Sequence, residues 1–182
     1  MTVRVGINGF GRIGRLALRE SWGAAGFEIV HINEIAGDAK SASHLLRFDS
    51  VHGTWDKDIS ASHSNDQIII DGQSIGYSQC ASIAETPWQA ANVDLVVECT
   101  GSLKTEQALA PYFAQGIAKI VVSAPIKGQP EETVLNVVMG VNEQKYKAQN
   151  IVTAASCTTN CLAPVIDVPV SYTHLRAHET RH

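Results

Sequence analysis

The chain has 182 residues, of which 45% are hydrophobic and 18% are charged. This length allows one domain, or one domain and part of a second, and the composition favours a packed core over a disordered chain. The formal net charge is −4 and no basic run occurs, so no nucleic-acid partner is expected. No segment approaches the roughly 20 apolar residues that cross a bilayer, and no basic leader with a cleavage site precedes the first strand. We therefore expect a cytoplasmic protein without a membrane partner.

Strands and helices alternate along the first part of the chain. Thr2–Asn8 is a β-branched run that ends in a glycine-rich turn, and the segment from Arg12 to about Ala24 carries apolar residues at helical spacing. Phe27–Asn33 predicts a second strand, and Ala39–Phe48 predicts a short helix. The order strand, helix, strand, helix is typical of an α/β unit.

The same alternation continues after a hairpin. Asp71-Gly72, between Gln67–Ile70 and Ser74–Tyr77, is a strong hairpin turn signal. Lys104–Gln115 predicts a helix that stops at Gly116. The other short strands are expected over Asp94–Glu98, Lys119–Ser123, Val137–Val141 and Ile151–Ala154. Because nearly continuous apolar strands suit a parallel sheet covered on both faces, we predict a doubly wound, mostly parallel α/β sheet of the Rossmann type.

The first turn has the pattern G-x-G-x-x-G, formed by Gly9-Phe10-Gly11-Arg12-Ile13-Gly14 between a strand and a helix. Gly9 would allow the tight turn, Gly11 would let the backbone approach a pyrophosphate, and Gly14 would let helix and strand pack closely. The helix N-terminus adds free N–H groups and a partial positive charge. The alternative is a purely structural turn.

Glu34 lies 20 residues after Gly14, at the end of the second predicted strand. At this position a carboxylate accepts hydrogen bonds from the adenosine ribose hydroxyls. Its charge would repel a 2′-phosphate, and no arginine follows, so NAD is expected rather than NADP. The alternative is a solvated glutamate without a ligand.

A cysteine follows the last predicted strand at the start of a helix. Ser156 can cap this helix, which places Cys157 in the first turn, where the helix dipole favours a thiolate. Pro164 is expected to kink the helix. The remaining cysteines, Cys80, Cys99 and Cys161, are interpreted as inert packing residues. No metal site is expected.

Three segments, Ile7–Arg15, Phe48–Gly53 and Ala155–Pro164, resemble signatures of the glyceraldehyde-3-phosphate dehydrogenase family. The resemblance covers about Thr2 to Val168. It implies that Cys157 is the catalytic nucleophile and that Ser156 and Thr158 contact a phosphorylated substrate. It also implies an NAD site formed by Asn8, Gly9, Phe10, Gly11, Arg12, Ile13, Gly14, Asn33, Glu34, Thr100, Gly101 and Ser123. The sequence departs from the family at Glu34, where an aspartate is usual, and at Ala81, where many members have an arginine.

The chemistry implied by the resemblance is covalent. The Cys157 thiolate would add to glyceraldehyde 3-phosphate or a similar phosphorylated aldehyde, a hydride would pass to NAD, and phosphate would capture the acyl thioester. The family's base histidine and anion sites lie in a second domain. We therefore expect residues 1–155 to be the NAD-binding domain, 156–168 to begin the catalytic domain, this chain to be inactive, and the full-length form to be a homotetramer.

The choice between subgroups rests on two further segments. Asn33–Ala39 and Asn136–Asn142 resemble most the variant associated with arsenic resistance, in which arsenate replaces phosphate as the acyl acceptor. Erythrose-4-phosphate dehydrogenases also carry Asn-Glu at this point and remain an alternative. A non-catalytic NAD-binding module is the other alternative, but it would have no use for a thiol at a helix N-terminus.

Residues 169–182 form the last segment and show neither a helical period nor a turn pattern. We expect this segment not to belong to the natural protein.

Overall fold

A nine-stranded sheet runs through residues 2–171, the part of the chain that the computed structural model describes. Its strand order is β10-β11-β9-β8-β1-β2-β7-β6-β5. Every neighbouring pair from β10 to β7 is parallel, and β7, β6 and β5 pair antiparallel at one edge. The predicted doubly wound, mostly parallel α/β fold is confirmed.

The strands of this sheet are β1 (Val3–Asn8), β2 (Phe27–Asn33), β5 (Ile59–Ala61), β6 (Gln67–Ile70), β7 (Gln73–Ser78), β8 (Leu95–Glu98), β9 (Lys119–Val122), β10 (Val134–Asn136) and β11 (Ile151–Thr153). A separate small hairpin pairs β3 (Phe48–Asp49) with β4 (Gly53–Thr54). The helices are α1 (Arg12–Ser21), α2 (Ala39–Arg47), α3 (Glu106–Ala114), the 3-10 turn η1 (Glu143–Lys145) and α4 (Cys157–Ser171). Within residues 2–171, no helix has both the length and the apolar character needed to span a lipid bilayer.

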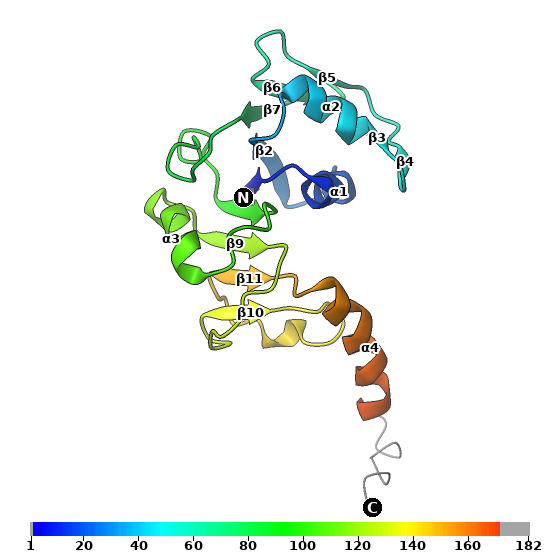
Figure 1. The fold of residues 1–182 in the computed structure, drawn as a ribbon, viewed down its shortest axis with the longest axis vertical. Helices are drawn as coiled ribbons and strands as arrows, with labels where there is room; N and C mark the ends of the chain where they lie inside the picture. Colours follow the sequence, from blue (N-terminus) through cyan, green and yellow to red (C-terminus); the bar gives the residue numbers. More distant parts are fainter. Residues whose placement is uncertain (1, 172–182) are drawn as a thin grey trace, which may run out of the picture.

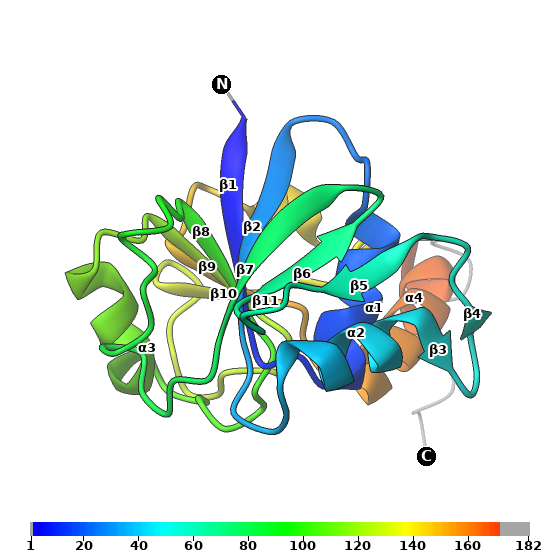
Figure 2. The same cartoon turned by 90° about the horizontal axis from the view of Figure 1, so that it is seen from above.

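Helices cover both faces of the sheet, with α1 and α2 on one side and α3 on the other (Figures 1 and 2). Alternate residues of β1 therefore enter different cores. Val5 and Ile7 pack in a cluster with Leu18 of α1. Gly6 faces the opposite side, where an added Cβ would lie 2.6 Å from the ring of the buried Trp88. The missing side chain at Gly6 thus makes room for the second core.

Most expected elements are present at or near the predicted boundaries. The hairpin turn is confirmed, because both Asp71 (φ 49°) and Gly72 (φ 83°) adopt the left-handed conformation that such two-residue turns require. Gly116 (φ 85°) follows the end of α3, as expected for a helix stop. The short strands β3, β4 and β5 were not predicted, because two- and three-residue strands are too short to show a period.

The strand expected over Val137–Val141 is wrong, and the strand lies at Val134–Asn136 instead. The Asn142 side chain accepts a hydrogen bond from Val138 N–H (2.7 Å) and donates one to Asn136 O (3.0 Å). These side-chain bonds close a turn around the apolar residues in place of a strand ladder.

Helix α4 continues through Pro164 to Ser171 and so enters the segment for which no helical period was found. A helix that already exists extends at little cost, which explains the longer element. Residues 172–182, which hold most of the segment predicted to be non-native, lie outside the described residues. That prediction and the proposed division at residue 156 stay predictions.

Candidate functional site: a nucleotide pocket and a cysteine at the carboxyl edge of the sheet

A cavity of about 710 Å³ opens where β1, β2 and β8 end. In the sheet, the chain proceeds from β1 to β2 on one side and later returns to β8 on the other side of β1. This point, where the strand order reverses, is the usual ligand position in open α/β sheets. Its lining residues are Asn8, Gly9, Gly11, Asn33, Glu34, Ile35, Ala36, Cys80, Ala81, Ser82, Ile83, Ala84, Cys99, Thr100, Ser102, Leu103 and Pro111. Six of the residues expected at an NAD site are among them.

Each of the three glycines in the first turn occupies a different steric environment, which explains why a glycine stands there. Gly9 has φ 87°, and a Cβ there would lie 2.6 Å from Thr100 N, so the turn packs directly on the next strand's exit. A Cβ on Gly14 would collide with the Gly9 carbonyl oxygen, which confirms the predicted close helix–strand packing. A Cβ on Gly11 would meet no atom within 4 Å, so the space above this residue is open. The turn therefore leaves open space in which a ligand can contact the backbone at Gly11.

The N-terminus of α1 lacks a side-chain cap, because its N-cap residue is Gly11. The other α-helices are capped: Asp38 accepts from Ser41 N–H, Thr105 from Ala108 N–H, and Ser156 from Thr159 N–H. Uncapped N–H groups at a helix start can bind an anion. The uncapped helix is the one that begins at the pocket.

Glu34 lies at the end of β2 and is half-buried. Its carboxylate accepts hydrogen bonds from Phe10 N–H (2.6 Å) and from Ala36 N–H (2.9 Å). The side chain thus holds the glycine turn and also lines the pocket, where it can accept from a ribose hydroxyl.

Asn8 and Asn33, both expected at the cofactor site, form the floor of the pocket and are 6% and 4% exposed. The Asn33 side chain donates to Asn8 Oδ1 (2.9 Å), and the Asn8 side chain donates to Glu98 Oε2 (2.9 Å). Their amides are bonded within the protein. Glu98, which sequence reasoning did not single out, is 1% exposed.

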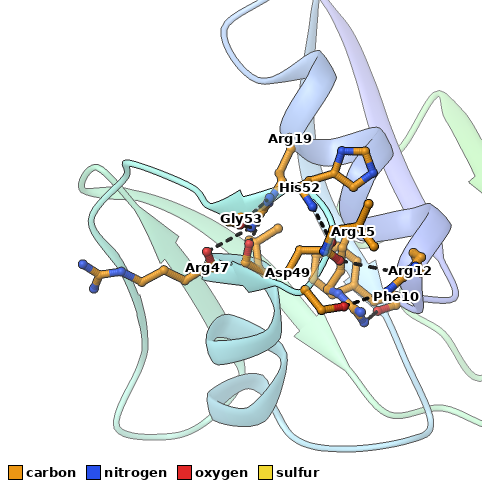
Figure 3. Close-up of polar contacts among 11 residues, drawn as sticks. Phe10, Arg12, Arg15, Arg19, Arg47, Asp49, His52 and Gly53 are labelled. Carbon is orange, nitrogen blue, oxygen red and sulfur yellow. Dashed lines mark hydrogen bonds and ion pairs between the residues drawn. The ribbon is translucent and has the colours of Figure 1, made fainter.

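Three arginines of α1 point toward the segment that follows α2 (Figure 3). Arg12 Nη2 donates to Ser50 Oγ (3.3 Å), and Arg19 Nε donates to Leu46 O (2.8 Å). Hydrogen bonds from His52 N–H and Val51 N–H lower the pKa of Asp49, which also lies 4.0 Å from Arg12 Nε. Arg12 and Arg19 therefore fix this loop beside α1, whereas Arg15 donates to Phe10 O (2.9 Å).

Of the remaining predicted cofactor residues, Arg12 and Ile13 are exposed on the first turn of α1, and Gly101 follows Thr100 with φ 71°. Ser123 N–H donates to Glu98 O (2.9 Å) at the end of β9. Phe10 is buried in the core with 2% exposure, and its N–H holds Glu34.

Cys157 is exposed in the first turn of α4. Ser156 Oγ accepts from Thr159 N–H (3.1 Å), so the predicted cap is confirmed. The preceding Ala155 has φ 54°, and Asn160 Nδ2 donates to Ala154 O (2.7 Å), which together shape the sharp exit from β11. Thr158 is exposed, and its hydroxyl lies 3.0 Å from that of Ser156.

The other cysteines differ from the expected buried packing residues. Cys161 is exposed, because α4 runs away from the sheet beyond β11 (Figure 1). Cys80 and Cys99 are half-buried and line the pocket. Burial raises the pKa of the Cys99 thiol to about 11. Within residues 2–171, no three His, Cys, Asp or Glu side chains gather as a metal site would require.

Of the wall formed by residues 80–84, sequence reasoning considered only Ala81, where many family members have an arginine, and it assigned no site residue there. This loop follows β7, which pairs parallel with β2 although a hairpin and a helix separate them in sequence. A hydrogen bond from Cys80 N–H to Asn33 Oδ1 (2.9 Å) holds the loop at the pocket. No local pattern marks residues 80–84, so only the strand pairing reveals their position.

Comparison with known proteins shows the family to which the chain is similar. Residues 3–106 match the family model for the NAD-binding domain of glyceraldehyde 3-phosphate dehydrogenase. The chain is 51% identical over 170 residues to glyceraldehyde-3-phosphate dehydrogenase 3 of Nostoc sp., with 92% of this chain and 49% of that protein aligned. It is 39% identical over 170 residues to the Geobacillus stearothermophilus glyceraldehyde-3-phosphate dehydrogenase, with the same coverage. The chain spans about half the length of the curated relatives it matches.

Proposed function

Because the chain belongs to the glyceraldehyde-3-phosphate dehydrogenase family and contains its NAD-binding domain, we propose that the whole protein is an NAD-dependent, phosphorylating aldehyde dehydrogenase. Cys157 is its nucleophile, and glyceraldehyde 3-phosphate or a similar phosphorylated aldehyde is its substrate. The observation that carries this proposal is the exposed Cys157 in the first turn of α4, at the same edge of the sheet as the nucleotide pocket.

The residues of the pocket fit NAD. The open space at Gly11 and the uncapped start of α1 suit a pyrophosphate, and Glu34 suits a ribose. When bound, NAD supplies the hydride acceptor that turns an aldehyde held on a thiolate into a thioester. The chain's own contribution is to orient the cofactor along the carboxyl edge of the sheet.

Cys157 follows β11, which lies three strand positions from β1 in the sheet, or about 14 Å at the usual strand spacing. All strands between them are parallel, so their carboxyl ends lie at one edge. The thiolate forms the bond to the aldehyde carbon, and the hydroxyls of Ser156 and Thr158 bind the substrate's anionic group. The helix N-terminus favours negative charge at all three residues.

For the acyl acceptor we propose an inorganic oxyanion, phosphate or its analogue arsenate. The likeness of Asn33–Ala39 to the arsenic-resistance variant supports arsenate as one of the two acceptors to test. An erythrose-4-phosphate substrate is the alternative on the aldehyde side, since its dehydrogenases share the Asn-Glu pair of Asn33 and Glu34.

We also propose that the whole protein is a homotetramer. Its support is the family resemblance. The apolar residues of α4 with 50% to 66% exposure, Leu162, Val165, Ile166 and Val168, leave a surface for the rest of the catalytic domain and for neighbouring subunits. Four large aliphatic side chains on one helix form a surface suited to packing against further protein.

The test of the proposed function is an NADH absorbance assay on the whole protein with NAD, the aldehyde and either phosphate or arsenate. Turnover should require Cys157, so Cys157→Ser should abolish it, whereas Cys161→Ser should retain it as the matched control. Binding of NAD should survive in both variants, which separates loss of chemistry from loss of cofactor. NAD binding without turnover in the whole protein would instead favour a non-catalytic binding module. For the 182-residue chain alone we expect NAD binding without turnover.

A further inference from the structure

A continuous chain of buried and partly buried side-chain hydrogen bonds crosses the floor of the pocket along the ends of β7, β2, β1 and β8. His31 Nε2 lies 2.8 Å from Ser78 Oγ, and Ser78 Oγ donates to Asn33 Oδ1 (2.9 Å). Asn33 Nδ2 donates to Asn8 Oδ1 (2.9 Å), and Asn8 Nδ2 donates to Glu98 Oε2 (2.9 Å). One polar network thus joins the four strands that surround the cofactor.

The direction of every bond in this chain is determined by backbone groups. Cys80 N–H can only donate, so the Asn33 atom that it meets is the oxygen, and Asn33 Nδ2 must face Asn8. Asn8 therefore presents its oxygen to Asn33 and its NH2 group to Glu98. Since the Ser78 hydroxyl hydrogen goes to Asn33, Ser78 accepts from His31, so the Nε2 nitrogen of His31 carries a hydrogen.

The chain of hydrogen bonds ends at the Glu98 carboxylate, and Asn8 Nδ2 also donates to the Tyr112 hydroxyl (2.5 Å). Oε2 accepts from Asn8 Nδ2 and from the Tyr112 hydroxyl (2.5 Å). Oε1 accepts from Thr100 N–H (2.8 Å) and from the Thr100 hydroxyl. Four donors and a fully buried position match an anionic acceptor.

Glu98 also joins the two turns that approach the cofactor. Asn8 immediately precedes Gly9, and Thr100 immediately precedes Gly101. The backbones of both turns are in direct contact, because Cys99 N–H donates to Asn8 O (2.6 Å) and a Cβ on Gly9 would lie 2.6 Å from Thr100 N. The carboxylate therefore holds both turns at one point beneath the pocket.

We propose that Glu98 is a positioning residue of the NAD site, whose carboxylate sets the direction of the hydrogen-bond chain and the register of the Gly9 and Thr100 turns. The inference rests on NAD binding by this chain. Glu98 lies below the pocket lining and acts through Asn8 and Thr100.

The test swaps the Glu98 carboxylate and the Asn8 amide, first one at a time and then together. Glu98→Gln places an NH2 group against either the Asn8 NH2 group or Thr100 N–H, so one buried donor pair loses its acceptor. We expect roughly tenfold or more weaker NAD binding, since hydrogen bonds to a buried charged group are worth more than neutral ones. Asn8→Asp alone opposes two carboxylates across 2.9 Å and should weaken binding similarly.

The double variant Asn8→Asp/Glu98→Gln restores every bond. The new Asp would accept from Asn33, from Tyr112 and from the new Gln NH2 group, while the Gln oxygen would accept from Thr100. NAD affinity should return to within about threefold of the original protein, which a purely steric role for Glu98 does not predict. Ser43→Ala is the control, because it removes a buried hydrogen bond to Ser60 O (3.1 Å) away from the pocket. It should leave NAD affinity unchanged.

The measurements are NAD titration and hydrogen exchange of the amides in the Gly9 and Thr100 turns. Each single substitution, Glu98→Gln or Asn8→Asp, should speed hydrogen exchange of these amides. The double variant should slow it again, with or without NAD. Unchanged affinity and exchange in Glu98→Gln, or no recovery in the double variant, would overturn the proposal. If Glu98→Gln does not fold, the comparison of Asn8→Asp with the double variant decides. Absent NAD binding by the original protein would refute the proposed function instead, while the exchange data would still test Glu98.

Discussion

The Glu34 carboxylate accepts a hydrogen bond from Phe10 N–H at 2.6 Å, so the end of β2 is fastened to the glycine turn that opens α1. The same carboxylate lines the nucleotide pocket. One side chain therefore shapes the turn and places a negative charge where the adenosine ribose is expected.

This charge predicts selectivity for NAD over NADP. A 2′-phosphate beside Glu34 would suffer like-charge repulsion, which costs several kcal/mol in a desolvated site. We expect at least roughly tenfold tighter binding of NAD, and Glu34→Gln should narrow the ratio while it keeps an acceptor for Phe10 N–H. Parallel titrations of both cofactors provide the measurement, and equal affinities in the unchanged protein would refute this role.

Gly11 and Gly14 should respond in opposite ways to alanine. Gly14→Ala forces a Cβ onto the Gly9 carbonyl oxygen and should lower the free energy of unfolding by about 1–3 kcal/mol. Gly11→Ala meets open space, so its thermal midpoint should be unchanged while NAD affinity falls. Thermal unfolding and NAD titration of the pair check both effects. An unaltered NAD affinity in Gly11→Ala would mean that the cofactor does not approach this residue.

Cys157 should be the most reactive of the four thiols. It is exposed at a helix N-terminus, whereas Cys80 and Cys99 are half-buried, and burial raises the pKa of Cys99 to about 11. Cys161 is also exposed but lies one turn further along α4, away from the N-terminal N–H groups. Mass spectrometry after limiting iodoacetamide should find the label at Cys157 first, and earlier labelling of Cys161 would contradict the helix-terminus argument.

His31 should make the protein less stable in mild acid. Burial lowers the pKa of His31 from 6.5 to about 4. Below about pH 6.5 His31 binds a proton in the unfolded chain, but in the folded protein it stays neutral until about pH 4. The free energy of unfolding therefore decreases as pH falls from 6.5 to 4. The expected loss between pH 7 and pH 4.5 is about 2.5 kcal/mol.

Urea unfolding at both pH values measures this loss. Replacement of the exposed His44 by Gln should leave the pH dependence intact, whereas His31→Gln should remove most of it. The depressed pKa values of Asp38 and Asp49 act below pH 3.8 and do not interfere. Equal stability at pH 7 and pH 4.5 would show that His31 is protonated in the fold.

Local sequence determined most of the helices and strands, the glycine turn and the position of Cys157. The apolar period of Arg12–Ser21, the glycines of the first turn, the Asp71-Gly72 hairpin and the Ser156 cap all act within a few residues, so their physics is visible in the sequence. For the same reason Cys157 could be placed at a helix start without a structure.

Tertiary structure alone revealed Glu98 beneath the floor of the pocket and the far wall at residues 80–84. Glu98 looks like one more residue of an apolar strand, and residues 80–84 carry no pattern, yet β1, β2, β7 and β8 bring them together across long sequence separations. Residues Val137–Val141 form a turn instead of the expected strand for the same reason, because the Asn142 side chain accepts a hydrogen bond from Val138 N–H that no periodicity reveals. A buried carboxylate is tolerated only where several donors converge on it, and that convergence is a property of strand pairing rather than of any single segment.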